Sequence, residues 1–242
     1  MSAQGRSLPA SVQPVHHVLA RDVALTLLSL GLLLAWDASG LDLAVVRAFG
    51  DAQGFVWRDA WFTRTLLHDG GRWLAWGVIA LMLADAMQPL LAGPRRSTRW
   101  YWLVVMLGCA LLVPAIKRVS LSSCPWDLTE FGGVAAYVTH WQWGAADGGP
   151  GHCFPSGHAV AAFAFFGGYF AWRGSRPRLA RTWLIAVCVV GGLFGWAQLA
   201  RGAHYPSHTL WSAWLCWSAC VLAAHAPRGP QGLASAQGTG RS

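Results

Sequence analysis

The stretch HCFPSGHAVAAFAFFGGYFAW, residues 152–172, decides the fold because it joins two histidines and a Pro-Ser-Gly turn directly to a long apolar run. An apolar run of about 20 residues can cross the hydrocarbon core of a bilayer. The composition agrees, since 55% of the 242 residues are hydrophobic and only 12% are charged, against about 25% in a soluble domain. The sequence therefore predicts an all-α integral membrane protein.

Six segments have the length and apolar character of membrane spans. We place them at residues 18–37, 73–93, 100–116, 154–172, 182–200 and 209–226. The first is the weakest because Arg21 and Asp22 interrupt it, and the apolar core of a cleaved signal peptide is the alternative. Together the segments predict a polytopic six-transmembrane-helix bundle.

The domain organisation is simple. Residues 1–226 are expected to form a single membrane domain, and residues 227–242 are rich in Gly, Ser, Pro and Gln and predict a disordered cytoplasmic tail. In the first exterior loop, the stretch FVWRDAWFTRTLL (residues 55–67) has one apolar side. This pattern predicts an interfacial helix.

The charges are divided unequally between two sets of loops. The termini and the loops on their side carry eleven arginines and two acids, while the opposite side carries seven basic residues and eight acids. Cytoplasmic loops are the ones rich in Lys and Arg, so we expect a multi-pass protein of a bacterial-type inner (plasma) membrane with both termini in the cytoplasm. The net charge of +8 then reflects topology. We expect membrane lipids as surroundings, no nucleic-acid partner and no obligate protein partner.

The turn at residues 155–158 has the residues of an anion site. Ser156 is a good helix-start residue, Gly157 allows close approach of a ligand, and the first amides of a helix have no helical acceptor. Such amides bind phosphate, and His158 would lie beside it as a proton donor. A capped helix with an interfacial histidine is the alternative.

Two further polar clusters lie on the same exterior side. In the stretch QLARGAHYPSH, residues 198–208, Arg201 can hold phosphate oxygens in a fork, and His204 can attack phosphorus to form a phosphohistidine. Lys117, at the exit of the third span, adds a positive charge. Each of these side chains alone could instead be an interfacial anchor.

These residues resemble a known family in their order and spacing. Lys117 is followed after six residues by Cys-Pro, then come Pro-Ser-Gly-His at 155–158 and His204 with Tyr-Pro-Ser. The chain is similar in this to the type 2 phosphatidic acid phosphatase superfamily, whose pattern is Lys-x6-Arg-Pro, Pro-Ser-Gly-His and Ser-Arg-x5-His-x3-Asp. The resemblance covers about residues 100–220, with the motifs within residues 117–208.

The resemblance implies a six-helix bundle that hydrolyses phosphate monoesters or diphosphates, usually of lipids, without a metal or other cofactor. Carried over by position, Lys117 binds the phosphate while Ser156 and Gly157 cradle it. His158 is then the acid that protonates the leaving oxygen, and His204 is the nucleophile.

The chain departs from the pattern at three positions. Cys124 stands where the first motif has Arg, and Gln198 stands where the third motif has Arg. Arg201 lies one turn after Gln198, on nearly the same helix face, and could supply the missing charge. His208 stands where the family has Asp, and Asp127 is a candidate substitute.

Cys124 and Cys153 lie outside the spans, one in each of the first two motifs. Both are expected on the oxidising side of the membrane, where disulfides form. We therefore predict a disulfide between them, with two free thiols as the alternative.

The sequence as a whole predicts a metal-independent lipid phosphate or diphosphate phosphatase that works through a phosphohistidine at the periplasmic face. One alternative is a phosphotransferase that passes the phosphoryl group to another lipid such as lipid A. A second is a catalytically weak lipid-binding relative, which the residues at 198 and 208 would explain. A third is a haem-binding electron carrier with His158 and His204 as ligands, but this leaves Lys117 and the Pro-Ser-Gly turn unexplained.

Overall fold

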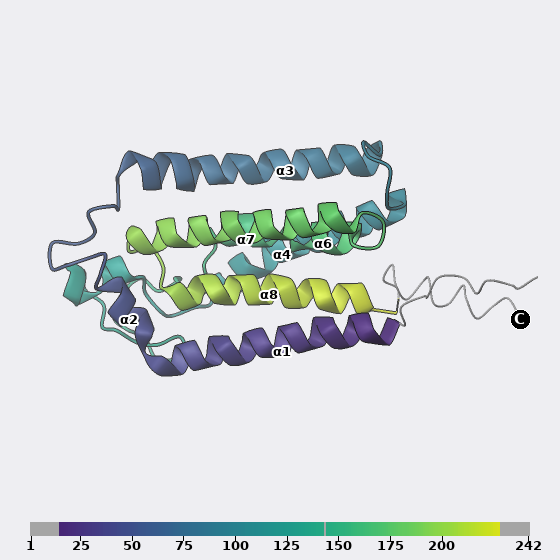
Figure 1. The fold of residues 1–242 in the computed structure, drawn as a ribbon. Helices are drawn as coiled ribbons and strands as arrows, with labels where there is room; N and C mark the ends of the chain where they lie inside the picture. The colour runs from purple at the N-terminus through teal and green to yellow at the C-terminus, as the bar shows by residue number, and fades with distance from the viewer. Residues whose placement is uncertain (1–14, 143, 228–242) are drawn as a thin grey trace, which may run out of the picture.

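The computed structural model describes residues 15–142 and 144–227 (Figure 1). These residues form helices joined by turns and irregular loops, and the part of the chain that is described contains no strand. The prediction of an all-α protein is therefore confirmed. The tail predicted to be disordered lies, apart from its first residue, outside the described residues.

Five long helices run side by side (Figure 1). They are α1 (Val15–Ser39), α3 (Gly70–Met87), α4 (Arg96–Arg118), α7 (Pro177–Ala200) and α8 (Pro206–His225). The short elements are α2 (Leu41–Val46), a π-helix η1 (Phe62–Asp69), two 3-10 turns η2 (Pro125–Asp127) and η3 (Thr129–Phe131), α5 (Val160–Phe163) and α6 (Phe166–Trp172). In Figure 1 the ends of the described chain lie at one end of the bundle, while α2 and the loops that carry the three polar motifs lie at the other.

Three helices are long and apolar enough to cross a membrane, namely residues His17–Ser39, Arg96–Arg118 and Pro177–Ala200. This finding fits a membrane protein. The other three expected spans stay predictions, although α3 and α8 occupy two of them. Within the expected span over residues 154–172, helical structure begins only at Val160 and is interrupted between α5 and α6.

The loop after α2 differs from the predicted interfacial helix. Phe55 is buried and its ring lies 4.9 Å from that of Phe131, centroid to centroid. Residues 55–60 are irregular, and the helical part begins near Trp61 and continues through η1 into α3. The exposed side chains of Trp61, Phe62 and Leu66 remain available to lipid. Packing of Phe55 against the 117–153 loop therefore overrides the amphipathic pattern.

Helix α8 is central to the bundle, since it contacts α1, α4, α5, α6 and α7. Glycines allow close packing between neighbouring helices.

At Gly191 on α7, an added Cβ would lie 2.2 Å from the ring of Phe163 on α5. Contact this close needs a residue without a side chain, so Gly191 sets the distance between α7 and α5.

Two acids at the end of the bundle opposite the motif loops, the buried Asp22 and the partly exposed Asp85, are paired with arginines. Asp22 on α1 accepts a hydrogen bond of 2.6 Å from Arg173 and lies 3.0 Å from the ring of His225. Asp85 on α3 pairs with Arg99 on α4. Because an unpaired charge within a membrane is expensive, these pairs explain how apolar helices tolerate acids near their ends.

We expect Gly191→Ala to lower the stability of the bundle by about 1–3 kcal/mol, the usual cost of overpacking a core. The neighbouring Gly192→Ala is the matched control, because a Cβ there meets nothing within 4 Å. The measurement is the midpoint of thermal unfolding in detergent. Equal midpoints for the two variants would contradict the close contact with Phe163.

Candidate functional site

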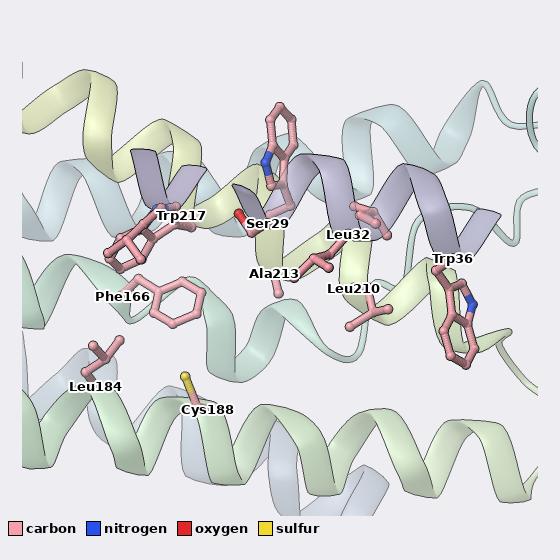
Figure 2. Close-up of a pocket in the computed structure, with 12 residues that line it drawn as sticks. Ser29, Leu32, Trp36, Phe166, Leu184, Cys188, Leu210, Ala213 and Trp217 are labelled. Atoms are coloured by element: carbon pink, nitrogen blue, oxygen red, sulfur yellow. The ribbon is translucent and has the colours of Figure 1, made fainter. Parts of the chain in front are cut away.

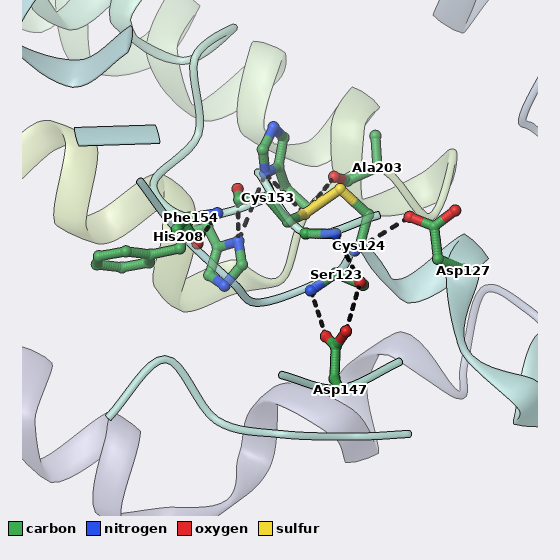
Figure 3. The surroundings of a disulfide bond; sticks show 11 residues. Ser123, Cys124, Asp127, Asp147, Cys153, Phe154, Ala203 and His208 are labelled. Atoms are coloured by element: carbon green, nitrogen blue, oxygen red, sulfur yellow. Dashed lines mark hydrogen bonds between the residues drawn. A yellow bond between two sulfur atoms is a disulfide. The ribbon is translucent and has the colours of Figure 1, made fainter. Parts of the chain in front are cut away.

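The first two motifs are tied together by a disulfide between Cys124 and Cys153 (Figure 3). The two chain segments also share backbone hydrogen bonds, from the N–H of His152 to the carbonyl of Ser120 (2.8 Å) and from the N–H of Cys153 to the carbonyl of Ser122 (2.9 Å). The loop after α4 and the loop before α5 therefore form one unit. It places the end of α4, with Lys117, beside the Pro-Ser-Gly turn.

A carboxylate that the sequence analysis did not single out fixes this unit. Asp147 accepts hydrogen bonds from the backbone N–H and the hydroxyl of Ser123, and from the N–H of Gly149 (Figure 3). Nothing in the local sequence distinguishes Asp147 from the other loop acids, because its partner lies 24 residues earlier. Its role here is structural.

Lys117 lies directly over the Pro-Ser-Gly turn. A Cβ built on Gly157 would be 3.6 Å from Cδ of Lys117 and 3.9 Å from its ammonium nitrogen. Among the described residues, neither the N–H of Gly157 nor that of His158 donates a hydrogen bond. The ammonium of Lys117 thus lies close to a turn in which two backbone N–H groups have no hydrogen-bond acceptor among the described residues.

The Pro-Ser-Gly turn is also anchored to α8. The N–H of Ser156 donates to the carbonyl of His208 (3.1 Å), and the hydroxyl of Ser212 donates to the carbonyl of Ser156 (2.9 Å). The hydroxyl of Ser156 accepts from the N–H of Ala159. The N–H of Ser156 is therefore already used within the protein, and the expectation that Ser156 and Gly157 cradle a phosphate stays a prediction.

His204 lies in the loop between α7 and α8 and is only 4% exposed. This loop turns at Gly202, whose φ is +72° and whose Cβ, if it had one, would lie 2.4 Å from the ring of Phe55. Nδ1 of His204 is 3.6 Å from Sγ of Cys153 and 3.5 Å from Nδ1 of His208. Burial, and then the charge of Lys117, hold the pKa of His204 well below its usual range. A neutral imidazole with its other nitrogen unused is the form that a nucleophile needs.

His158 is the second buried imidazole of the cluster and lies in the turn before α5. Its ring stacks on His68 at 4.5 Å and lies 4.9 Å from that of Phe194, and its Nε2 is 3.1 Å from the carbonyl oxygen of Leu67. Burial, followed by the charges of His68 and Arg201, lowers the pKa of His158 to about 4. His68, from η1, is a neighbour that the sequence gave no reason to place here.

Arg201 and Gln198 lie together at the end of α7 and are both buried. Nε of Arg201 donates to the carbonyl of Arg58 (2.8 Å), and another of its nitrogens is 3.5 Å from the side-chain oxygen of Gln198. The amide nitrogen of Gln198 is buried and has no hydrogen-bond partner among the described residues. A buried donor without an acceptor costs free energy, so this position favours a ligand that brings an oxygen.

Among the described residues, no carboxylate lies within hydrogen-bond distance of the rings of His204 and His208. Asp127 accepts from the N–H of Cys124 at 3.2 Å, so the structure does not bring it to an imidazole as the proposed substitute for the family Asp. Asp42 accepts from the backbone N–H and the hydroxyl of Ser207. The imidazole of His208, at the family's Asp position, lies 3.1 Å from the carbonyl oxygen of Cys153. The orienting partners of His204 are therefore an imidazole and a loop, not a carboxylate.

Within the described residues, the one cluster with metal-ligand geometry is Cys124, Cys153 and His204. The two sulfur atoms are joined to each other, so they do not offer thiolate ligands in this state. The haem alternative also lacks support, because Nε2 of His158 faces the carbonyl oxygen of Leu67 and Nδ1 of His204 faces sulfur.

A cavity of about 650 Å³ has no histidine among its lining residues (Figure 2). It runs along the seam between α1 and α8, and its walls include Leu32, Trp36, Phe166, Leu210 and Trp217. A smaller cavity of about 220 Å³ lies between α3, α5 and α7 and is lined in part by Phe194, the neighbour of His158. Both cavities are lined mainly by apolar side chains, so they are suited to hold a hydrocarbon chain rather than a reacting group.

We expect the free energy of unfolding to fall as the pH drops from 7.5 to 5. An unfolded histidine takes up a proton near pH 6.5, whereas His204, whose pKa is lowered by burial, does not. Its contribution is thus present above pH 6.5 and is lost below it, by at most about 1.4 kcal/mol per pH unit. His204→Gln should reduce the slope of the free energy of unfolding against pH by up to about 1.4 kcal/mol per pH unit, which corresponds to one proton. The substitution of an exposed histidine, His17→Gln, should leave this slope unchanged. A slope unaltered by His204→Gln would contradict the burial of a neutral ring.

A comparison with protein families agrees with this geometry. The family model described as PAP2 superfamily matches residues 99–230, which is more than half of the chain and includes all three motifs. No curated protein and no solved structure matches the chain. The paired histidines, the lysine and the Pro-Ser-Gly turn therefore lie within the matched region, and the chain belongs to the PAP2 superfamily, whose members are generally phosphatases.

Proposed function

We propose that this chain is an integral-membrane phosphatase that hydrolyses a lipid phosphate or diphosphate through a phosphohistidine. The observation that carries the proposal is the set of unused donors around His204. The ammonium of Lys117, the amides of Gly157 and His158, and the unpartnered amide of Gln198 belong to segments that surround this ring. A phosphoryl group has enough oxygens to accept from all of them.

In the first step, the free nitrogen of His204 attacks phosphorus, and the bond between phosphorus and the leaving oxygen breaks. His158 gives its proton to that oxygen, so that a neutral alcohol or a phosphate monoester departs. His158 is neutral in the free protein because its pKa is about 4, and a bound phosphate anion would raise this pKa and supply the proton. In the second step, neutral His158 takes a proton from water, whose oxygen attacks the phosphohistidine and releases phosphate.

The lipid character of the substrate is supported by the surroundings of His158. The leaving group departs on the side of this ring, and Phe194, which contacts the ring, also lines the apolar cavity between α3, α5 and α7. A hydrocarbon chain attached to the leaving oxygen would enter this cavity.

The membrane side follows from the charge distribution in the loops. The arginine-rich loops lie on the side of both termini, which is the expected cytoplasmic side. The motif loops lie at the other end of the bundle in Figure 1. We therefore assign the phosphatase site to the periplasmic face of an inner membrane, where the lipid substrate is reached from the outer leaflet.

We expect His204→Ala to abolish phosphate release from any substrate, because the nucleophile is lost. His158→Ala should abolish release from an alkyl phosphate but retain part of the release from p-nitrophenyl phosphate, whose leaving group needs no proton. Brief incubation with ³²P-labelled lipid phosphate should give an acid-labile phosphoprotein that His204→Ala lacks. The exposed His17→Ala is the control. A labelled His204→Ala protein, or turnover that a chelator stops, would refute the mechanism.

Transfer of the phosphoryl group from the phosphohistidine to a second lipid, instead of to water, would show that the chain is a phosphotransferase. The same assay detects it, because labelled lipid would then appear in place of free phosphate. The phosphohistidine is common to both reactions, so this outcome alters the acceptor and leaves the nucleophile in place.

We expect Lys117→Ala and Arg201→Ala each to lower kcat/KM by about 10²-fold, the effect of removing one donor that stabilises transition-state charge. Gln198→Glu should be at least as harmful, because it keeps the shape of the side chain and repels the phosphate. Arg118→Ala is the matched control for Lys117, since Arg118 is the next residue and is exposed. The measurement is the initial rate of phosphate release. If Lys117→Ala and Arg118→Ala lowered kcat/KM equally, the effect of Lys117 would come from the overall positive charge of the region and not from direct contact with the phosphate.

A further inference from the structure

The disulfide does more than join two loops, because its sulfur atoms lie close to the ring of His204, which we propose as the nucleophile. Sγ of Cys153 lies 3.6 Å from Nδ1 of His204. One ligand atom each from Cys124, Cys153 and His204 lie within 4.8 Å of one another, and all three residues are buried.

The spacing matches what a tetrahedral zinc ion requires. With Zn–N of about 2.0–2.1 Å and Zn–S of about 2.3 Å, neighbouring nitrogen and sulfur ligands are about 3.6 Å apart and two sulfurs are about 3.8 Å apart. The distance between Nδ1 of His204 and Sγ of Cys153 already has this value. Once the covalent bond between the sulfurs is broken, they separate to non-bonded contact, and only Cys124 and Cys153 need to adjust.

We propose that reduction of the Cys124–Cys153 disulfide creates a buried Cys2His site for a soft divalent cation, above all Zn²⁺, in which His204 is the nitrogen ligand. A dithiol reductant supplies two electrons and two protons, so that the disulfide becomes two thiols and the reductant becomes its own cyclic disulfide. Binding of the cation then releases the two thiol protons. Two thiolates and one neutral imidazole are a ligand set that zinc prefers, and their charge of −2 offsets that of the ion.

The surroundings favour this site. The ring of His208 lies beside these three residues, since its Nδ1 is 3.5 Å from that of His204. The backbone hydrogen bonds between residues 120–122 and 152–153 keep the two cysteine-bearing segments together after reduction.

The consequence for catalysis depends on the proposed function, but metal binding itself does not. A cation on Nδ1 holds the ring of His204 in place and withdraws electrons from the nitrogen that would attack phosphorus. The phosphatase would then be active with the disulfide intact and inhibited when it is reduced in the presence of zinc.

The test uses the full chain purified in detergent, reduced with dithiothreitol, freed of reductant by anaerobic gel filtration, and titrated with Co²⁺ as a spectroscopic probe. We expect one equivalent of Co²⁺ to give thiolate-to-cobalt charge-transfer absorption and tetrahedral ligand-field bands, which Zn²⁺ then removes. The oxidised protein should give neither. Absence of the charge-transfer band in the reduced protein, or its equal presence in the oxidised protein, would overturn the proposal.

Variants assign the ligands. Cys124→Ser should abolish the charge-transfer band, and His204→Gln, which keeps the disulfide and the volume of the side chain, should weaken Co²⁺ binding by at least about tenfold. The controls are Cys188→Ser, which removes an exposed thiol, and Cys109→Ala, which removes a buried thiol of the bundle core; both should behave as the wild type. A band that persists at full strength in His204→Gln would show that the nucleophile is not a ligand.

Activity is measured in parallel on the same samples. Zn²⁺ should abolish phosphate release only after reduction, and a chelator should restore it. If the metal binds and phosphate release is unaffected, the claim that the site controls the nucleophile fails. If no sample releases phosphate, the proposed function fails, while the cobalt spectra still decide whether the site exists.

Discussion

The contact between residues 153–156 and the first turn of α8 is the constraint on which the rest of the site depends. The N–H of Ser156 donates to the carbonyl of His208, and the ring of His208 in turn lies 3.1 Å from the carbonyl oxygen of Cys153. These bonds fasten the Pro-Ser-Gly turn to the end of the loop that holds His204. Without them, the two imidazoles of the site would lie on separate segments with no fixed distance between them.

The electrostatics of the site follow from how its acids are used. Asp37, Asp42, Asp127 and Asp147 lie in the motif loops or close to them, yet each accepts hydrogen bonds from structural N–H or O–H groups. Lys117, His158 and His204 are left without a carboxylate partner among the described residues. An ammonium withdrawn from water without such a partner is unfavourable, and a bound anion relieves this cost. The same imbalance keeps the imidazole of His204 neutral, as both phosphoryl transfer and metal binding require.

The departures from the family pattern become understandable in this setting. Beside Gln198, where the family pattern has an arginine, lies Arg201, which contacts Gln198 and acts on His158 through its charge. The arginine missing at position 124 is replaced by a cysteine whose disulfide joins the first two motifs covalently. At position 208 an imidazole replaces a carboxylate, and the consequence is that sulfur and a second imidazole, rather than an acid, face Nδ1 of His204.

The sequence by itself determined the helical class, the family and the identity of the residues that meet at one end of the bundle, because hydrophobic period and motif spacing are local properties of the chain. It could not determine where the 152–172 helix begins, because the hydrogen bonds of Ser156 to α8 decide this. It could not place His68 against His158 or Asp147 on Ser123 either. These contacts join residues that are distant in the chain, so only the tertiary structure, which decides which side chains share a buried volume, brings them together.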